Sequence, residues 1–119
     1  MNKPRILFSL VLLLAASANL AHAGKSTALR SPEAGVLCDR YMCANNKGVS
    51  RELTEKHLGK KAVTRLFAQG DFDRTEFTFV NGIFCDIKEQ LCRKDRYYGV
   101  EGKRSGAVSE KYTKLLFRQ

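Results

Sequence analysis

The sequence predicts a small α+β domain in which one antiparallel sheet packs with two short helices and two local disulfides hold the hairpins. Three observations support this fold class. β-Branched and aromatic residues surround the turn dipeptide Asn81-Gly82, four cysteines stand in two closely spaced pairs, and two stretches that follow Ser or Thr carry apolar residues at helical spacing. The 119 residues allow one small domain at most, and 44% hydrophobic with 28% charged residues are typical of a folded chain.

Residues 1–23 have the pattern of a secretory signal peptide. Lys3 and Arg5 precede the apolar run Ile6–Ala16. Ala21-His22-Ala23 then places small residues around a cleavage point before Gly24. The apolar run has 11 residues and as a helix would cover about half of a ~30 Å hydrocarbon core. It is therefore too short for a membrane anchor, and we expect it to be removed on export.

Removal of residues 1–23 would leave 96 of the 119 residues, with 19 Lys and Arg against 12 Asp and Glu and a net charge of +7. No later apolar run approaches the length of a transmembrane helix, so we expect a periplasmic protein, with secretion beyond the outer membrane left open. Residues 24–34 are polar and expected to be mobile. Residues 35–117 are expected to form a single domain that is cross-linked by disulfides.

The four cysteines are expected to form two local disulfides in the oxidising compartment that export implies. Cys38 and Cys43 enclose four residues and would close a tight hairpin over Val36–Ala44, while Cys85 and Cys92 enclose six. A chain that folds back at the middle of either stretch places its two cysteines opposite each other. A zinc site and a redox pair are the alternatives. The spacings are not those of the usual zinc-binding pairs and no C-x-x-C occurs, so we expect no metal and no cofactor.

After a turn at Asn45–Gly48, a helix is expected to begin at Ser50 or Thr54, because either residue is a good N-cap. Apolar residues at positions 58, 62 and 66 recur at helical spacing, and the helix is expected to continue as far as Gly70. Gly59 would weaken this helix by up to ~1 kcal/mol relative to Ala.

The clearest element is a β-hairpin around Asn81-Gly82. Thr75–Val80 and Ile83–Ile87 are strand-forming runs, and Asn-Gly between two such runs is typical of a two-residue type I′ turn. Pairing about this turn would place Phe79 opposite Phe84 on one face and Thr78 opposite Cys85 on the other.

The C-terminal part is expected to complete the sheet and supply the second helix. Leu91–Tyr98 would add a third strand and make the sheet a meander. Glu101–Gly106 is expected to be a loop, and Ser109–Phe117 a short terminal helix.

Two parts of the sequence are similar to each other. Gly35–Asp39 and Gly82–Asp86 share the order glycine, two apolar residues, Cys-Asp. Downstream of each cysteine pair, Val-Ser is followed after three residues by Thr, at 49–54 and 108–113. Duplication and chance similarity between small hairpins both remain open.

The sequence offers few residues for acid–base catalysis. His57 would be the one histidine left after export, which excludes catalysis by a histidine pair, and we expect it to be a surface or capping residue. No hydrolase, zinc-protease or calcium-loop motif occurs. Asp71 and Asp73 are spaced for glycosidic chemistry, but their Gly-Asp-Phe-Asp context favours a turn. We therefore expect no enzyme, and a hydrolase built on these three residues is the alternative.

A basic, tyrosine-rich segment between residues 93 and 104 is the candidate binding surface. It carries five cations and two tyrosines in twelve residues. Cations attract phosphate- and carboxylate-rich polymers, and tyrosine rings stack on flat groups. A charged edge strand that prevents aggregation would have the same composition. The members of the candidate surface are Arg93, Lys94, Arg96, Tyr97, Tyr98, Lys103 and Arg104.

Several stretches together carry a family resemblance. They are Ser31–Asp39, Leu53-Thr54 with Leu58-Gly59, Phe77-Thr78 with Asn81–Asp86 and Cys92, and Thr113–Phe117. Over residues 31–117 the chain resembles the Fels prophage protein-like family, the small exported YcgJ-type proteins of Gram-negative bacteria. The resemblance implies export, the four-cysteine pattern and a single domain. It assigns no catalytic or binding residues.

We expect the protein to be a non-enzymatic binding module for an anionic envelope polymer or a periplasmic protein. Nucleic acid fits the positive charge but not the compartment. The alternative is a small secreted enzyme or an inhibitor of a secreted enzyme. An inhibitor of a basic lysozyme would be expected to be acidic, because like charges oppose association.

Export makes a direct prediction about the N-terminus. Because Ala23 precedes the predicted cleavage point, protein recovered from the periplasm should begin at Gly24, as read by intact mass and N-terminal sequencing. Periplasmic protein that still carries Met1 would contradict the signal peptide.

Overall fold

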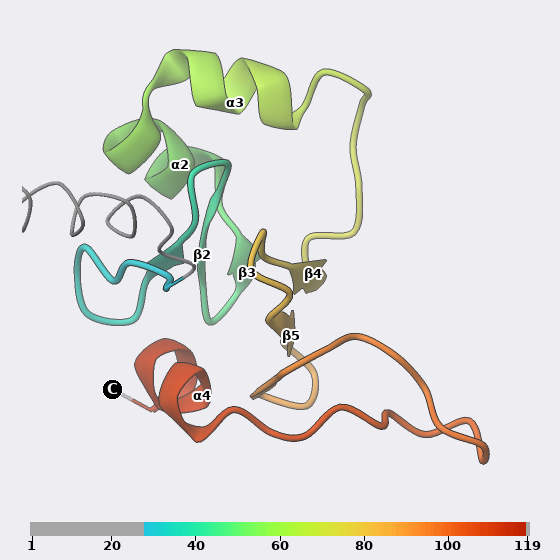
Figure 1. The fold of residues 1–119 in the computed structure, drawn as a ribbon. Coiled ribbons are helices and arrows are strands. Elements are labelled where there is room, and N and C mark those ends of the chain that lie inside the picture. Colours follow the sequence, from blue (N-terminus) through green and yellow to red (C-terminus); the bar gives the residue numbers. More distant parts are fainter. Residues whose placement is uncertain (1–27, 119) are drawn as a thin grey trace, which may run out of the picture.

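Two small sheets and three helices make up the described part of the chain. The computed structural model describes residues 28–118 (Figure 1). Each sheet has three antiparallel strands, in the orders β1-β2-β3 and β4-β5-β6. The predicted α+β class, meander and terminal helix are confirmed, but the third strand of the meander ends at Arg93 and does not continue to Tyr98 as expected. The strand β3 and the division of the first helix were not predicted. The elements are β1 (Leu37–Cys38), β2 (Cys43–Asn45), β3 (Gly48–Val49), α2 (Arg51–Leu58), α3 (Lys60–Leu66), β4 (Glu76–Thr78), β5 (Phe84–Asp86), β6 (Leu91–Arg93) and α4 (Glu110–Phe117).

Both predicted disulfide hairpins are present. Cys38 lies opposite Cys43 across β1 and β2, and Cys85 lies opposite Cys92 across β5 and β6. A disulfide joins each pair, and all four side chains are fully buried. The short spacing in the sequence therefore identified the correct pairing.

The central hairpin differs from the prediction by one residue of register. Phe77 lies opposite Cys85, and Thr78 lies opposite Phe84. The expected pairing of Phe79 with Phe84 was wrong. The observed register buries both phenylalanines of the first strand, with Phe77 at 5% and Phe79 at 1% exposure. Burial selects the register, because a slip of one residue would turn each side chain of the strand to the opposite face.

The turn of this hairpin explains the shift. Its loop has three residues, because the Phe79 N–H donates to the Ile83 carbonyl at 2.8 Å and the Gly82 N–H donates back to the Phe79 carbonyl at 2.8 Å. Within the turn only Gly82 has a positive φ, 93°. A type I′ turn needs positive φ at both central residues, so the predicted type was wrong. The loop is instead a type I turn followed by a glycine bulge.

Gly59 divides the helix that was expected to continue to Gly70. Ser50 is the N-cap of α2, and its Oγ accepts a hydrogen bond from the Leu53 N–H at 3.0 Å. Gly59 then adopts φ 98° and ψ 168°, a conformation essentially restricted to glycine, so α2 ends and α3 begins. The expectation of one continuous helix was therefore wrong. α2 and α3 pack against each other instead of continuing in line (Figure 1).

The chain repeats one arrangement, which we call module 1 (residues 30–58) and module 2 (residues 77–117). In each module the first cysteine pairs with the residue eight positions upstream, Arg30 for Cys38 and Phe77 for Cys85. An aspartate follows each of these cysteines, and its Oδ1 accepts two backbone N–H groups of the hairpin loop. These aspartates are Asp39 and Asp86.

In both modules a serine and a threonine tie the following helix to the second cysteine. The Ser50 N–H donates to the Cys43 carbonyl at 2.9 Å, and Thr54 Oγ1 accepts from the N–H of the same cysteine at 3.0 Å. Ser109 and Thr113 make the same bonds in module 2, at 2.7 and 2.9 Å. Both threonines are fully buried. The similarity between the two parts of the sequence therefore corresponds to a repeated tertiary arrangement.

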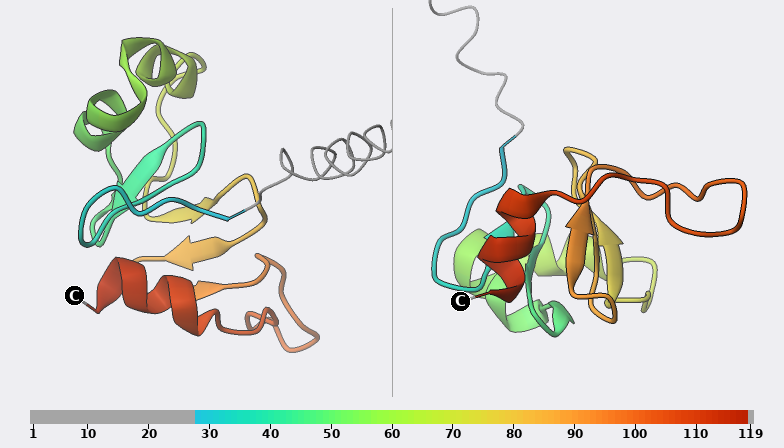
Figure 2. Two further views of the ribbon diagram at one scale, coloured as in Figure 1. Left: turned by 60° about the vertical axis from the view of Figure 1, so that its left-hand side comes forward. Right: turned by 90° about the horizontal axis from the view of Figure 1, so that it is seen from below.

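The main core lies where α4 packs on strands of both sheets (Figure 2). Leu116 and Tyr112 of α4 are buried in it together with Leu37, Phe77 and Phe79. A second, smaller cluster surrounds the first disulfide.

Packing against this core begins before residue 35. The Leu29 N–H donates to the Tyr112 hydroxyl at 3.3 Å, and Leu29 itself is 9% exposed. Arg30 exchanges backbone hydrogen bonds with Cys38. The predicted signal peptide and residues 24–27 lie outside the described residues.

The repeated threonine bond makes a stability prediction. Thr54→Val or Thr113→Val would leave a buried cysteine N–H without its acceptor, and each should lower the free energy of unfolding by about 1–3 kcal/mol. Thr64→Val is the matched control, because that exposed threonine bonds only the Lys60 carbonyl of its own helix. Urea unfolding of the oxidised protein measures all three. Equal losses in the three variants would contradict the role of the buried threonines.

Candidate functional site: the basic arm

The two modules differ most in the segment that joins the second cysteine strand to the helix. In module 1 a tight turn connects β2 to β3, and Ala44 pairs with Val49. In module 2 the equivalent pair is Arg93 with Val108. Residues 94–107, which we call the arm, take the place of the turn. Figure 1 shows the arm, in orange to red, extending away from the body of the fold.

The arm has the hydrogen bonding of a hairpin. At its tip the Gly99 N–H donates to the Lys103 carbonyl at 2.7 Å, and the Gly102 N–H donates to the Gly99 carbonyl at 3.2 Å. Gly102 has a φ of 74°, so this tip repeats the three-residue loop of residues 80–82. Nearer the base, the Ser105 N–H donates to the Tyr97 carbonyl at 3.0 Å. The backbone of the arm is therefore held along its length.

Arg104 fixes the arm to the second sheet. Its guanidinium carbon lies 4.2 Å from the ring centroids of both Phe84 and Tyr98. The same group donates to Glu76 Oε1 and to the Arg96 carbonyl, each at 3.0 Å. The side chain is only 11% exposed. Arg104 is therefore a structural residue that locks the arm over β4 and β5.

Arg93 holds the base of the arm in a similar way. Its guanidinium donates to the Glu89 carboxylate and, at 2.8 Å, to the Gly106 carbonyl. Its side chain is 16% exposed. Gly106 leaves no room for a side chain, because a Cβ atom there would lie 2.6 Å from the Asp95 carbonyl oxygen. The two strands of the arm therefore meet closely at this point.

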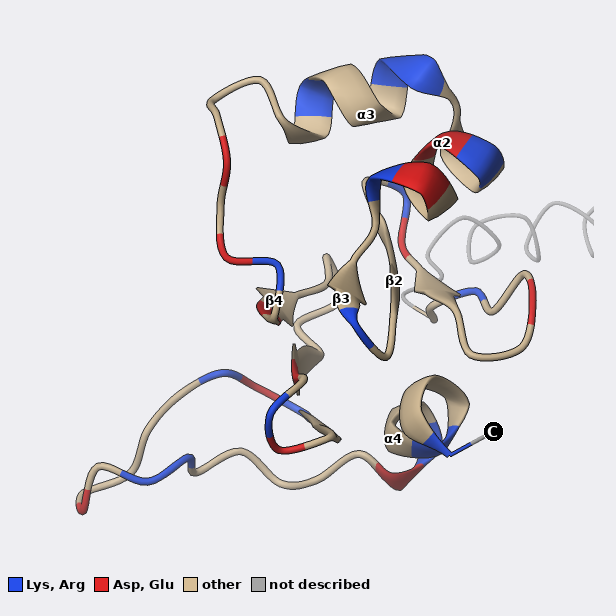
Figure 3. Ribbon diagram, turned by 180° about the vertical axis from the view of Figure 1, so that it is seen from behind, with Lys and Arg blue, Asp and Glu red and all other residues tan. Residues whose placement is uncertain are grey.

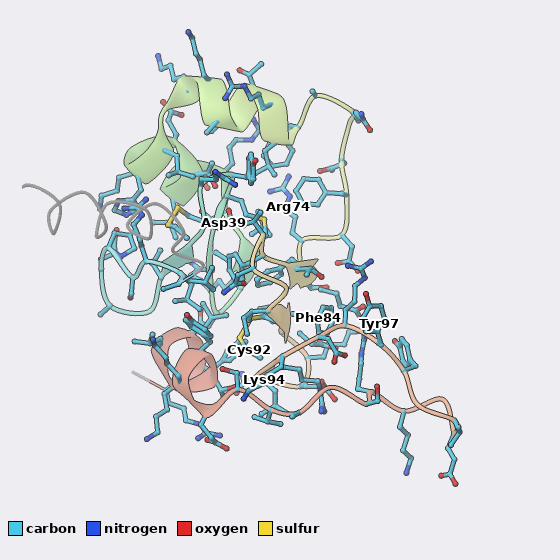
Figure 4. The ribbon with its side chains drawn as sticks, in the orientation of Figure 1. Asp39, Arg74, Phe84, Cys92, Lys94 and Tyr97 are labelled. Carbon is cyan, nitrogen blue, oxygen red and sulfur yellow. A yellow bond between two sulfur atoms is a disulfide. The ribbon has the colours of Figure 1, made fainter. Side chains whose placement is uncertain are left out.

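The other five residues of the candidate surface face solvent. Tyr97 and Tyr98 are 60% and 59% exposed, and Lys94, Arg96 and Lys103 are exposed as well. None of these three cations has an ion-pair partner within residues 28–118. Figure 3 shows basic residues along the arm, and Figure 4 labels Lys94 and Tyr97 on it. The structure thus divides the predicted set into two enclosed residues that hold the arm and five exposed residues, of which Tyr98 also packs against Arg104.

His57 and its neighbour Lys56 bind the N-terminal part of the fold. Glu33 Oε2 lies 2.7 Å from His57 Nε2 and 3.0 Å from Lys56 Nζ. These hydrogen bonds, first from Lys56 and then from His57, lower the pKa of Glu33 below its usual value. The His57 side chain is only 16% exposed, so it is not the open surface residue that was one of the two expectations, and its contact is with Glu33.

The two aspartates of the hydrolase alternative have separate structural partners. Asp71 forms an ion pair with Arg74 at 3.2 Å. Asp73 accepts bonds from the hydroxyl and then the N–H of Thr75, and these bonds lower its pKa. Both carboxylates shape the turn before β4.

Residues 28–118 contain neither a cluster of metal-ligating side chains nor a membrane-spanning helix. Nowhere in this range do three His, Cys, Asp or Glu side chains gather closely enough to hold a metal ion. The helices in the same range are too short or too polar to cross a bilayer.

Sequence reasoning located the basic segment but missed what fixes it. Nothing in the segment itself indicates that Arg104 would be enclosed by Phe84 and Glu76. The comparison of the two similar parts of the sequence nevertheless contained a signal for the arm. Val-Ser follows Cys43 by six residues but follows Cys92 by sixteen, so module 2 contains an insertion at this point.

Comparison with known proteins places the chain in a family. The family model described as YcgJ protein matches residues 29–117, which include both modules and the arm. The chain belongs to the YcgJ family. The curated relative named "Uncharacterized protein YcgJ", from Escherichia coli strain K12, is 52% identical over 99 residues. The match covers 83% of this chain and 81% of the relative. No solved structure matches this YcgJ-family chain.

The enclosure of Arg104 makes a prediction about the arm. Arg104→Lys keeps the positive charge but loses the planar group that stacks on two rings and bonds two acceptors. Hydrogen exchange at the amides of Gly99 and Ser105 should become about tenfold faster, which corresponds to about 1.4 kcal/mol. Lys103→Gln, at the exposed neighbouring position, should leave exchange unchanged. Equal protection in Arg104→Lys and the unmodified protein would show that Arg104 does not hold the arm.

Proposed function

We propose that the protein is exported and acts as a non-enzymatic binding module that contacts an anionic component of the cell envelope through the arm. The observation that carries this proposal is the arm itself. It is an insertion in one of two otherwise similar modules, it is held by hydrogen bonds along its length, and its exposed side chains include three cations and two tyrosines. Loops presented by a rigid scaffold are common places for binding residues.

Charge and shape favour an anionic ligand. Lys94, Arg96 and Lys103 contribute three of the positive charges in the net charge of +7 that the chain would carry after removal of residues 1–23. Because Arg93 and Arg104 already bind protein groups, the exposed cations are those that a phosphate or carboxylate would meet first. Tyr97 and Tyr98 can pack against sugar rings or acyl groups beside these charges.

The proposed location rests on the N-terminal sequence pattern and on the disulfides. Residues 1–23 have the features of a cleaved signal, and both buried disulfides are compatible with an oxidising compartment. Peptidoglycan and lipopolysaccharide are the abundant anionic polymers of such an envelope. A periplasmic protein with an acidic surface is the other partner that the arm would fit.

The non-enzymatic part of the proposal rests on where the titratable groups lie. His57 binds Glu33, and Asp71 and Asp73 serve the turn before β4. The arm presents cations and tyrosines to solvent. Such groups suit recognition of an anion more than proton transfer at neutral pH.

Co-sedimentation tests the proposal directly. The oxidised, exported protein is mixed with peptidoglycan sacculi or with lipopolysaccharide vesicles at low and at high salt. The arm variant Lys94→Glu/Arg96→Glu/Lys103→Glu should bind about tenfold more weakly, at roughly 0.5 kcal/mol for each lost contact. The control variant Lys47→Glu/Lys60→Glu/Lys61→Glu changes the net charge equally at exposed positions outside the arm.

The outcomes separate a shaped site from general charge attraction. Binding that persists at high salt and is lost only in the arm variant supports the proposal. Binding that vanishes at high salt, or falls equally in both variants, would show only the attraction expected of a basic protein. If the unmodified protein does not pellet, the envelope-polymer proposal fails and an acidic protein partner becomes the target of the search.

A further inference from the structure

A second addition to the repeated scaffold lies at the other end of the molecule. Each module ends with a helix, α2 in module 1 and α4 in module 2. Module 1 is followed directly by a further helix, α3, which has no counterpart in the described part of module 2. Figure 1 shows the β1–β2 loop reaching toward α2 and α3, far from the arm. Between this loop and α3 is a cavity of about 240 Å³, lined by Arg40, Tyr41, Ala62, Arg65 and Leu66.

The lining combines aliphatic side chains with two arginines that have no carboxylate partner within residues 28–118. Ala62 and Leu66 are one turn apart on α3 and are partly buried. Arg40 lies over the ring of Tyr41, with its guanidinium carbon 5.4 Å from the ring centroid. Neither Arg40 nor Arg65 has a carboxylate partner in the part of the chain that the structure describes. Two unpaired guanidinium groups therefore border a small apolar cavity.

The same loop in module 2 shows that this lining is not a requirement of the scaffold. The aspartate that begins the loop makes the same backbone bonds in both modules. At the centre of the loop, however, module 1 has Arg40 and Tyr41, while module 2 has Lys88 and Glu89. Tyr41 is 52% exposed and caps no core cluster. The exposed ring and the neighbouring cation are therefore additions to module 1.

The size and charge of the cavity define what would fill it. At ~30 Å³ for each water-sized group, 240 Å³ holds about eight non-hydrogen atoms. An aliphatic body would cover Ala62 and Leu66, and a carboxylate would meet Arg40 and Arg65, because guanidinium and carboxylate match in geometry. A C-terminal leucine of a peptide and a six-carbon fatty acid both have this chemistry.

We propose that the cavity between the β1–β2 loop and α3 binds a short aliphatic carboxylate, with Arg40 and Arg65 holding the carboxylate and Leu66 contacting the aliphatic body. The site does not depend on the arm. The proposed function of the arm and this second site can therefore fail or succeed separately.

Titration followed by two-dimensional amide NMR tests the site. Hexanoate is the probe, since it has the eight non-hydrogen atoms for which the cavity has room. Acetate tests the charge alone, and hexylamine tests the aliphatic chain without the carboxylate. N-acetyl-leucine and its amide then separate a peptide C-terminus from a fatty acid, because the leucine side chain and carboxylate would enter the cavity while the acetyl group stays outside it. The oxidised, exported protein is used throughout.

The expected result is a saturable shift at residues 40–41 and 62–66 with hexanoate and little response to acetate or hexylamine. Arg65→Gln should weaken hexanoate binding about tenfold, since a lost charge-assisted bond is of that order. Lys61→Gln is the matched control, because Lys61 is exposed on the same helix outside the cavity and carries the same charge. Leu66→Ala should also weaken binding, and unchanged shifts elsewhere would show that each variant is folded.

Several results would overturn the proposal. These are the absence of a saturable shift at these residues, equal responses to acetate and hexanoate, or equal losses in Arg65→Gln and Lys61→Gln. Saturation by N-acetyl-leucine but not by its amide would assign the ligand to peptide C-termini. Saturation by hexanoate alone would assign it to short fatty acids, and both results support the site.

Discussion

The structure depends on the link between each disulfide hairpin and the helix that follows it. A short disulfide fixes the register of two strands, but it does not place a helix. The placement comes from two backbone groups of the second cysteine, which bond a serine N–H and a buried threonine Oγ1 at the start of the helix. Because the N–H of Cys43 and that of Cys92 are buried, losing either acceptor would leave an unsatisfied donor in the core.

Both modules form this link, and each uses a serine, a threonine and an aspartate to do so. The serine caps its helix, the threonine bonds the cysteine, and the aspartate after the first cysteine holds the hairpin loop. Asp39 also accepts the Val80 N–H at 2.7 Å and so joins module 1 to the central hairpin. The polar residues that the modules share are therefore structural. The segments in which they differ, the arm and the region around α3, are the places to look for ligands.

Basic residues in the arm have two different roles that composition does not distinguish. Arg104 is enclosed by two aromatic rings and a carboxylate, whereas Lys103 beside it is exposed. The enclosed arginines hold the backbone of the arm, whereas the other three cations are exposed to solvent. A count of positive charge would treat all five cations as one patch.

The sequence by itself determined the elements whose signals are local. Cysteine spacing gave the disulfide pairing, Ser109 gave the start of α4, and strand-forming residues around positions 81–82 gave the central hairpin. Only the tertiary structure decided the register of that hairpin, since burial of Phe77 and Phe79 outweighs the local preference of Asn-Gly for a type I′ turn. It also decided which arginines of the arm are available, because the partners of Arg104 come from β4 and β5, about twenty to thirty residues away in sequence. Contacts between residues so far apart follow from packing, and a local pattern does not contain them.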